Sequence, residues 1–305
     1  MKAIDLSVNF AGVTLKNPVV TVSGTCGFGE EYAPFYKPSE LGAIAVKGMT
    51  LAPRLGNPPP RIAETPAGIL NSIGLQNPGV DAFVENELPR LKAEGACVIA
   101  NISGSTIADY CKVAEILSET DVDFIEMNIS CPNVKEGGVA FGTNAKTVNE
   151  ITSEVKKHTN KPLIVKLSPN VTDITEMARA AEAGGANALS LINTLLGMRI
   201  DLKTRRPILH NNVGGLSGPA VFPVAVRMVW QVRNAVSLPL LGMGGIASAE
   251  DAIEMLIAGA DAIGVGTAMF ANPNLPMEIA DGIAKYMEAN SIEHVADISA
   301  TVQPW

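Results

Sequence analysis

Five consecutive apolar runs in this sequence each end in a lysine or an asparagine. The five residues are Lys47, Asn101, Asn128, Lys166 and Asn193. If these runs are parallel strands of one barrel, their carboxyl ends open on the same face, where barrel enzymes carry their chemistry. Two ammonium groups and three amides on one face suit a planar, anionic ligand that forms hydrogen bonds.

One acidic residue is predicted to lie inside the barrel with this set. Side chains alternate along a strand, so Glu126 shares a face with Asn128, one layer deeper. The same alternation places Lys166 on the inner face of the next strand. A buried carboxylate needs a partner. We therefore expect Glu126 to form a structural ion pair rather than to act in catalysis.

Glycine-rich turns follow the last two apolar runs. They read GMGGI from Gly242 and GVGTAMF from Gly264, and GLSGP at 215–219 adds a third. Exposed N–H groups at such turns bind phosphate, and barrels often build a phosphate site from the last two loops. No GxGxxG motif follows the first run and opens a helix. The pattern therefore favours FMN over NAD as a phosphate-bearing cofactor.

The surroundings of Cys131 predict a reactive thiol. Cys131 lies just after the fourth run and precedes Pro132 and a glycine-rich stretch typical of a lid. A thiol with an ordinary pKa of about 8.5 needs only a modest shift to act as a base. We expect Cys26, Cys97 and Cys111 to pack as small hydrophobic residues. No C-x-x-C pair occurs, so we expect no metal site, iron–sulfur cluster or disulfide.

The elements that position these residues follow from alternating apolar runs and helical patterns. The eight runs are Pro18–Ser23, Ala43–Lys47, Cys97–Asn101, Asp123–Asn128, Pro162–Lys166, Asn187–Asn193, Pro239–Gly242 and Asp261–Gly266. Apolar spacing near 3.6 predicts helices over Asp81–Glu94, Ile107–Glu119, Ala145–His158, Asp173–Ala183, Ala220–Ala235 and Glu250–Ala258. Eight alternations predict one α/β domain over residues 1–305, a (β/α)8 TIM barrel. A doubly wound open sheet is the alternative.

Three segments stand outside the regular alternation. The connections 48–80 and 194–219 are too long for ordinary βα loops, and we expect long functional loops at the C-terminal face. The segment Leu6–Asn17 alternates like a small hairpin and is expected to cover the bottom of the barrel.

Composition and charge exclude several classes of protein. Hydrophobic residues make up 47 % of the 305 residues, enough for a large core. The net charge of −8 and the lack of a basic stripe argue against nucleic-acid binding. No apolar block approaches the roughly 20 residues of a membrane span, and the N-terminus has no signal-peptide pattern. We expect a cytoplasmic protein without a membrane partner.

Six strings, in this order, resemble the class 1 dihydroorotate dehydrogenases over essentially the whole chain. They are NSIGLQNPG at 71–79, NISCPNVKEGG at 128–138, VKLSPN at 165–170, INT at 192–194, GGLSGPA at 214–220 and GMGGI at 242–246. SGTCGFG at 23–29 and GVAFGTN at 138–144 are more similar to the class 1B catalytic subunit. The membrane-bound class 2 enzymes use a serine base and an N-terminal membrane segment, and this sequence shows neither.

The resemblance implies oxidation of (S)-dihydroorotate to orotate in de novo pyrimidine (UMP) biosynthesis. Cys131 would remove the C5 proton while the C6 hydride passes to FMN. The implied substrate-binding residues are Lys47, Asn71, Ser72, Ile73, Gly74, Leu75, Asn128, Asn193 and Thr194. The implied FMN-binding residues are Ser23, Lys47, Gly48, Asn101, Asn128, Lys166, Ile192, Gly218, Gly244, Gly245, Gly266 and Thr267.

The resemblance also implies partners. The chain would bind one FMN, form a homodimer, and join an iron–sulfur flavoprotein subunit in a heterotetramer. FAD and a [2Fe–2S] cluster on that subunit would pass electrons to NAD⁺. One alternative is a class 1A-like enzyme that reduces fumarate without a partner. More distant alternatives are a flavin barrel of the dihydrouridine synthase kind and a flavin-free phosphate-binding barrel such as an aldolase.

Overall fold

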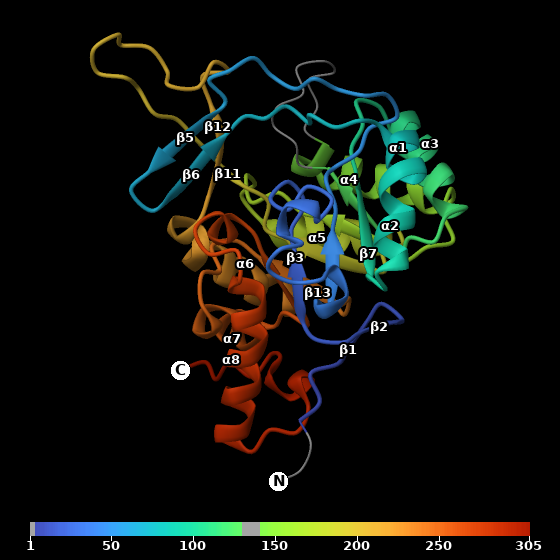
Figure 1. Ribbon diagram of the computed structural model, residues 1–305, viewed down its shortest axis with the longest axis vertical. Helices are drawn as coiled ribbons and strands as arrows, with labels where there is room; N and C mark the ends of the chain where they lie inside the picture. The colour runs from blue at the N-terminus through green and yellow to red at the C-terminus, as the bar shows by residue number, and fades with distance from the viewer. Residues whose placement is uncertain (1–3, 130–140) are drawn as a thin grey trace.

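A closed barrel of eight parallel strands forms the centre of the molecule (Figure 1). The computed structural model describes residues 4–129 and 141–305. In chain order the barrel strands are β3 (Val19–Thr21), β4 (Ala43–Ala45), β7 (Val98–Ile102), β8 (Phe124–Asn128), β9 (Leu163–Lys166), β10 (Ala188–Leu191), β13 (Leu240–Met243) and β14 (Ala262–Val265). Each strand pairs in parallel with its neighbours, and β14 closes the barrel against β3. The predicted (β/α)8 fold is confirmed.

The barrel strands are buried on both faces, as their apolar sequences predict. Every residue of β7 and β9 is buried, and so are the first four residues of β8. Side chains that point inward fill the barrel, and those that point outward pack under the helices. This double burial explains why the strands read as continuous apolar runs rather than as alternating patterns.

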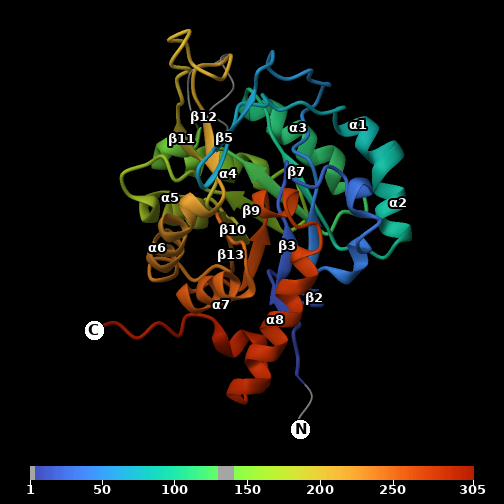
Figure 2. The ribbon, with the colours of Figure 1, turned by 60° about the vertical axis from the view of Figure 1, so that its left-hand side comes forward.

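Helices surround the barrel on the outside (Figure 2). They are α1 (Val80–Ala82), a π-helical turn (Phe83–Glu87), α2 (Leu88–Ala93), α3 (Ile107–Ser118), α4 (Ala145–Lys156), α5 (Ile174–Ala183), α6 (Phe222–Arg233), α7 (Ala249–Ala258) and α8 (Leu275–Asn290). The six predicted helical segments match these elements to within a few residues. The long helix α8 was not predicted. Within the described ranges, none of the helices has the length and apolar composition of a membrane span.

A small hairpin covers the amino-terminal end of the barrel, as predicted. Its strands β1 (Val8–Phe10) and β2 (Val13–Leu15) pair antiparallel around a turn at Ala11 and Gly12, both with positive φ. Phe10 is buried and meets Phe124, the first residue of β8, edge to face with ring centroids 5.9 Å apart. This contact fixes the hairpin on the end of the barrel opposite the predicted site.

The two long connections do more than loop over the carboxyl end of the barrel. They pair into a second, antiparallel sheet with strand order β11-β12-β6-β5. Its strands are β5 (Ile62–Thr65), β6 (Gly68–Asn71), β11 (Leu195–Gly197) and β12 (Gly214–Ser217). The expected long connections are present at the C-terminal face, and backbone groups of one connection are paired with those of the other. Figure 1 shows this sheet at one end of the barrel.

Candidate functional site

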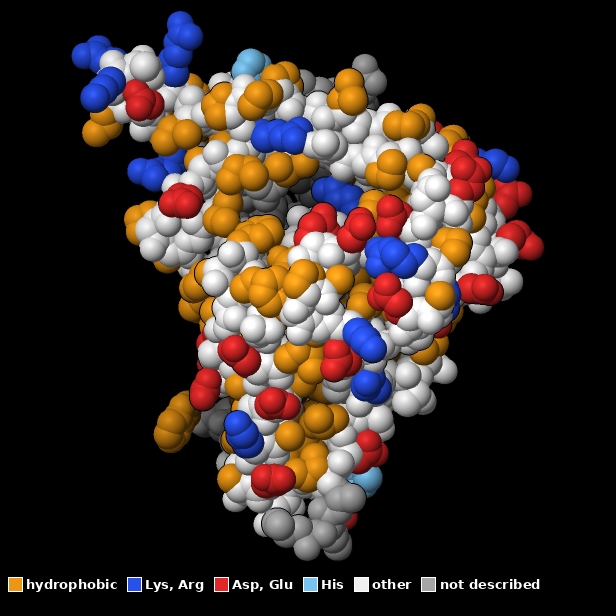
Figure 3. Space-filling model, in the orientation of Figure 1, with side chains coloured by type: hydrophobic (Ala, Val, Ile, Leu, Met, Phe, Trp, Pro, Cys, Tyr) orange, Lys and Arg blue, Asp and Glu red, His pale blue; other side chains and the backbone are white. Residues whose placement is uncertain are grey.

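A cavity of about 500 Å³ lies between the carboxyl ends of the barrel strands and the second sheet. The molecule is hollowed on this face, below the sheet (Figure 3). The predicted residues that line the cavity are Ser23, Lys47, Gly48, Asn71, Ile73, Gly74, Leu75, Asn101, Asn128, Lys166, Ile192, Asn193, Thr194, Gly218, Gly244, Gly245, Gly266 and Thr267. This volume is within the range of small-molecule and cofactor sites.

Two predicted site residues are not among those that line the cavity. Ser72 is fully buried, its N–H donates to the carbonyl of Arg61 at 2.8 Å, and its own carbonyl accepts from Asn57 at 2.9 Å. Ser72 directly follows β6, and these hydrogen bonds tie the end of that strand to Asn57 and Arg61, which precede β5. Cys131 lies outside the described residues, so its predicted role remains a prediction.

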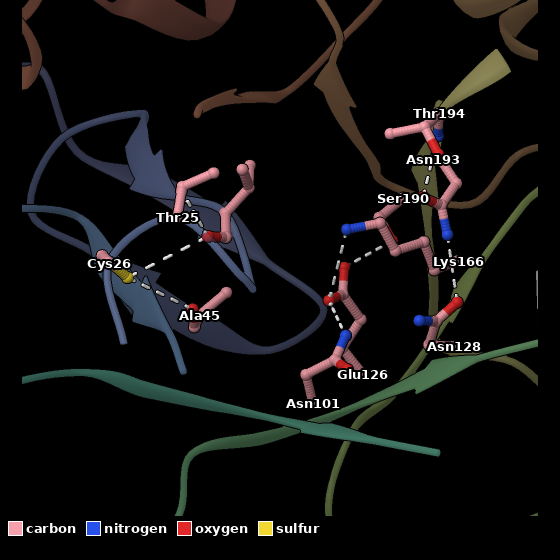
Figure 4. Close-up of polar contacts among 11 residues, drawn as sticks. Thr25, Cys26, Ala45, Asn101, Glu126, Asn128, Lys166, Ser190, Asn193 and Thr194 are labelled. Atoms are coloured by element: carbon pink, nitrogen blue, oxygen red, sulfur yellow. Dashed lines mark hydrogen bonds and ion pairs between the residues drawn. The ribbon is translucent and has the colours of Figure 1, made fainter. Parts of the chain in front are cut away.

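The buried acid that the strand alternation predicted lies directly below the floor of the cavity. The Oε2 atom of Glu126 accepts a hydrogen bond from Asn101 Nδ2 at 2.5 Å, and Lys166 Nζ lies 3.8 Å from it (Figure 4). The Oε1 atom accepts from the hydroxyl of Ser190 at 2.6 Å. Glu126 is fully buried, and the predicted ion pair is present. The carboxylate thus joins side chains from β7, β9 and β10.

Two asparagines form a second polar group beside this floor. Asn193 donates from Nδ2 to Asn128 Oδ1 at 3.1 Å, and its own Oδ1 accepts from the N–H of Thr194 at 2.8 Å. The hydroxyl of Tyr110, on α3, donates to the carbonyl of Asn128 at 2.7 Å. These contacts fix the two amides in place at the ends of β8 and β10. A preorganised amide pair can recognise a planar ligand that carries both donors and acceptors.

The opposite end of the cavity is built from glycine turns. Gly244 and Gly245 follow β13 with φ of 124° and 83°, in the region that favours glycine. Gly218, with φ of 96°, precedes the short 3₁₀ turn at Pro219–Val221 and α6. Thr267 donates from its hydroxyl to Ser217 Oγ at 2.8 Å, which links β12 to the turn after β14. Backbone N–H groups at such turns can bind a phosphate.

The structure corrects the interpretation of GLSGP as a third glycine turn. Residues 214–217 belong to β12, and only Gly218 lies in a turn. A Cβ on Gly215 would lie 2.0 Å from Thr194 Oγ1, so this glycine is required by close packing inside the second sheet. The GLSGP string therefore begins in β12 and ends in the turn at Gly218 and Pro219.

The second sheet supplies the roof of the cavity. Asn71 ends β6 and donates from Nδ2 to the carbonyl of Gly215 at 3.3 Å. The apolar residues Ile62, Ile69 and Leu216 come from the same sheet and also line the cavity. Apolar walls with a few fixed polar groups are typical of sites that bind a flat heterocyclic ring.

The cysteines in the described ranges are not placed as nucleophiles. Cys26 is buried, and its thiol contacts Thr21 Oγ1 at 3.2 Å. The thiol also lies 3.6 Å from the carbonyl oxygen of Ala45 (Figure 4). Burial raises the pKa of Cys26 to about 11 and that of Cys97 to about 12. Burial also raises the pKa of Cys111. These thiols stay protonated near neutral pH, in agreement with the expectation that they pack as small hydrophobic residues.

Several residues that line the cavity were missed by the sequence analysis. They are Val22, Gly24, Thr25, Ser217, Val221, Met243, Ile246, Gly264, Ala268 and Phe270, besides the three apolar residues of the roof. Most lie one or two positions from a predicted residue, so widening each strand end and glycine turn would have found them. Phe270 ends the 3₁₀ turn after β14 and is 57 % exposed; it is the last residue of the GVGTAMF string but was not predicted as a site residue.

Comparisons with known proteins agree with this geometry. The family described as dihydroorotate dehydrogenase matches residues 5–287. A protein of Alkaliphilus oremlandii named dihydroorotate dehydrogenase B (NAD(+)), catalytic subunit, is 58 % identical over 96 % of this chain and 97 % of its own. Proteins with the same name from Bacteroides thetaiotaomicron and Thermoanaerobacter pseudethanolicus are 54 % and 53 % identical, each over 98 % of this chain and 99 % of its own. The resemblance found in the sequence is confirmed, and the chain belongs to the dihydroorotate dehydrogenase family.

Proposed function

We propose that this protein oxidises (S)-dihydroorotate to orotate, a step of pyrimidine biosynthesis, with FMN bound in the cavity. The observation that carries the proposal is the convergence of four asparagines, two lysines and the glycine turns on one cavity. The amides and lysines would suit a planar ring, and the glycine turns would suit a phosphate. This set occurs in a chain of the dihydroorotate dehydrogenase family.

The residues fit FMN at both ends of the cavity. The turns at Gly218, Gly244 and Gly245, with Gly266 and Thr267, would hold the phosphate. Ser23, Gly48, Asn101, Lys166 and Ile192 would contact the ring system and ribityl chain. The buried Asn101 Oδ1 has no hydrogen-bond partner within the described chain, as expected of an atom in a site built for a ligand. Lys166 would place a positive charge where reduced flavin carries negative charge.

The substrate would lie beside the ring at the Asn128 end of the cavity. Asn71, Asn128, Asn193 and Thr194 would hold the pyrimidine ring through amide and hydroxyl hydrogen bonds, with the segment 72–75 beside it. Lys47 would pair with the substrate carboxylate and contact the flavin. The amide pair formed by Asn128 and Asn193 is already ordered, so little side-chain entropy would be lost on binding.

The reaction needs a base for one proton and an acceptor for one hydride. Cys131 follows Asn128 by three positions in the sequence, and we propose that its thiolate removes the proton from C5. Bound FMN supplies the acceptor for the hydride that leaves C6. The C5–C6 bond becomes a double bond, so orotate is two electrons more oxidised than the substrate. A positioned base of this kind typically contributes about 10²–10⁴-fold to the rate.

We further propose that the electrons leave through a second protein. The relatives are named as the catalytic subunit of an NAD(+) enzyme, which supports a separate subunit with FAD and a [2Fe–2S] cluster that reduces NAD⁺. A homodimer that joins two such subunits in a heterotetramer is the assembly we propose. A class 1A-like enzyme that uses fumarate would need no such partner.

The test is an anaerobic titration of the purified chain with dihydroorotate. We expect a yellow protein whose flavin absorbance bleaches as orotate forms. A yellow protein that does not bleach, alone or with the electron-transfer subunit, would refute the substrate. A colourless protein that takes up no added FMN would refute the flavin site. Reoxidation by NAD⁺ only when the partner subunit is added would support the proposed assembly, and rapid reoxidation by fumarate would contradict it.

A further inference from the structure

Glu126 is a buried carboxylate for which the reaction has no direct use. It is 0 % exposed and is not among the residues that line the cavity, yet it contacts two residues that are. Asn101 donates to its Oε2 atom at 2.5 Å, and Lys166 Nζ lies 3.8 Å from the same atom (Figure 4). Ser190 holds the other oxygen at 2.6 Å.

The strand register explains why these four side chains meet. Asn101 lies directly opposite Glu126 in the pairing of β7 with β8. Lys166 lies directly opposite Ser190 in the pairing of β9 with β10. The carboxylate therefore sits at the centre of four neighbouring strands, one layer below the cavity. A charge held this way moves little when a ligand binds above it.

Glu126 also decides which way the amide of Asn101 points. A carboxylate surrounded by donors accepts hydrogen bonds, so the amide nitrogen of Asn101 faces it and Oδ1 faces away. That Oδ1 atom lies beside the cavity residue Gly48, where a Cβ would be only 2.7 Å from it. Within the described ranges it is buried and has no partner. By orienting the amide in this way, Glu126 leaves Asn101 Oδ1 available as a hydrogen-bond acceptor beside Gly48.

Building on the proposed flavin site, we infer that Glu126 is a positioning residue with an electrostatic function. It holds Lys166 and Asn101 in place for the flavin, and its buried negative charge lowers the reduction potential of that flavin. A negative charge disfavours the added electrons of the reduced ring, and low-dielectric surroundings strengthen the effect. Lys166 acts in the opposite direction from a position nearer the cavity, so the pair together sets the potential.

The test replaces Glu126 with glutamine, which keeps the volume and removes the charge. We expect Glu126→Gln to bind reduced FMN about tenfold better relative to oxidised FMN than the wild type does. For a two-electron couple, that ratio raises the midpoint potential by about 30 mV. A merely structural role would weaken both redox states alike and leave the potential unchanged. Ser190→Ala is the matched control, because it removes a hydrogen bond to the carboxylate and keeps the charge; its potential should stay at the wild-type value.

A second pair of variants covers the case in which Glu126→Gln does not fold. Lys166→Gln and the double variant Lys166→Gln/Glu126→Gln differ only in the charge of Glu126, as the wild type and Glu126→Gln do. The double variant leaves no unpaired charge in the core. The double variant should have the higher potential. Equal potentials in both comparisons would overturn the inference. Failure of the wild-type chain to bind FMN in the same titration would instead refute the proposed flavin site.

Discussion

The turn after β13 offers a strict test of the link between backbone geometry and cofactor binding. Gly245 has φ of 83°, and a Cβ added there would lie 2.7 Å from Phe222 Cβ and 2.8 Å from Phe222 N. It would also lie 2.9 Å from the carbonyl oxygen of Gly218. Two of these three atoms are backbone, one at the start of α6 and one at Gly218 before the 3₁₀ turn, so Gly245→Ala requires the turn or the helix to move.

The expected cost of Gly245→Ala has two parts. An alanine with positive φ costs roughly 1–2 kcal/mol. Relief of the close contacts adds about 1–3 kcal/mol, as in other overpacked sites. A total of about 2–5 kcal/mol lowers the Tm of a chain of this length by about 3–8 °C. Loss of one hydrogen bond to a phosphate would weaken FMN binding by about 10- to 150-fold.

Gly185 provides the control for this experiment. It also has positive φ, 91°, but an added Cβ would meet only Lys156 Cγ, at an ordinary 3.5 Å. Gly185→Ala carries the backbone strain without the clash and lies between α5 and β10, away from the cavity. We expect Gly185→Ala to lower Tm less than Gly245→Ala does and to leave the Kd for FMN unchanged. Thermal unfolding of the apoprotein and fluorescence titration with FMN measure the two effects. Wild-type FMN affinity in Gly245→Ala would refute the assignment of this turn to the phosphate. A wild-type Tm would refute the expected backbone strain and close contacts at this position.

Three further outcomes are expected. Cys131→Ser should keep FMN bound but slow flavin reduction by dihydroorotate about 10²–10⁴-fold at neutral pH, because a serine hydroxyl is a poor base; a normal rate in stopped flow would rule out Cys131 as the base. Phe10→Ala should lower the free energy of unfolding by about 3–5 kcal/mol, because Phe10 is buried against Phe124, and should leave FMN affinity intact at the far end of the barrel; urea titration measures the first and FMN titration the second. The pKa of Cys26 is raised from 9.0 to about 11 by burial, so its stabilisation is fully present below pH 9 and is lost as pH rises to about 11. The wild type should lose about 1.4 kcal/mol more stability per pH unit in this window than Cys26→Ala, and parallel urea titrations that superimpose would contradict it.

The barrel could be predicted because its strongest signals are local. A strand buried on both faces reads as a short apolar run, and the polar residue at its end marks the carboxyl edge. Asn128 and Lys166 were identified in this way, and they lie opposite each other in the pairing of β8 with β9. Alternation along β8 then placed Glu126 one layer below. These inferences need only the period of a strand and the parallel arrangement.

Helix α8 could not be predicted with the same rules, because its sequence contains residues of low helix propensity. Pro276 and Gly282 lie within Leu275–Asn290 and both lower helix propensity. The proline occupies the first turn, where it is tolerated. The glycine allows α8 to approach α7 closely, since a Cβ on Gly282 would lie 2.2 Å from Ala249 Cβ. The residue that lowers the helical propensity of the segment is therefore the one that its tertiary contact requires.

The roof of the cavity depends on pairing between distant segments, which a single sequence does not reveal. β6 and β12 are joined by the pairing of Asn71 with Gly215, 144 residues further along the chain. Both strands are short and contain glycine, so neither has the β-branched pattern of an independent strand. Asn71 could therefore be assigned to the site only through resemblance, whereas Asn128 and Asn193 followed from the strand ends. Since each connection supplies only half of the sheet, neither could cover the cavity alone, and the roof exists only where the two pair.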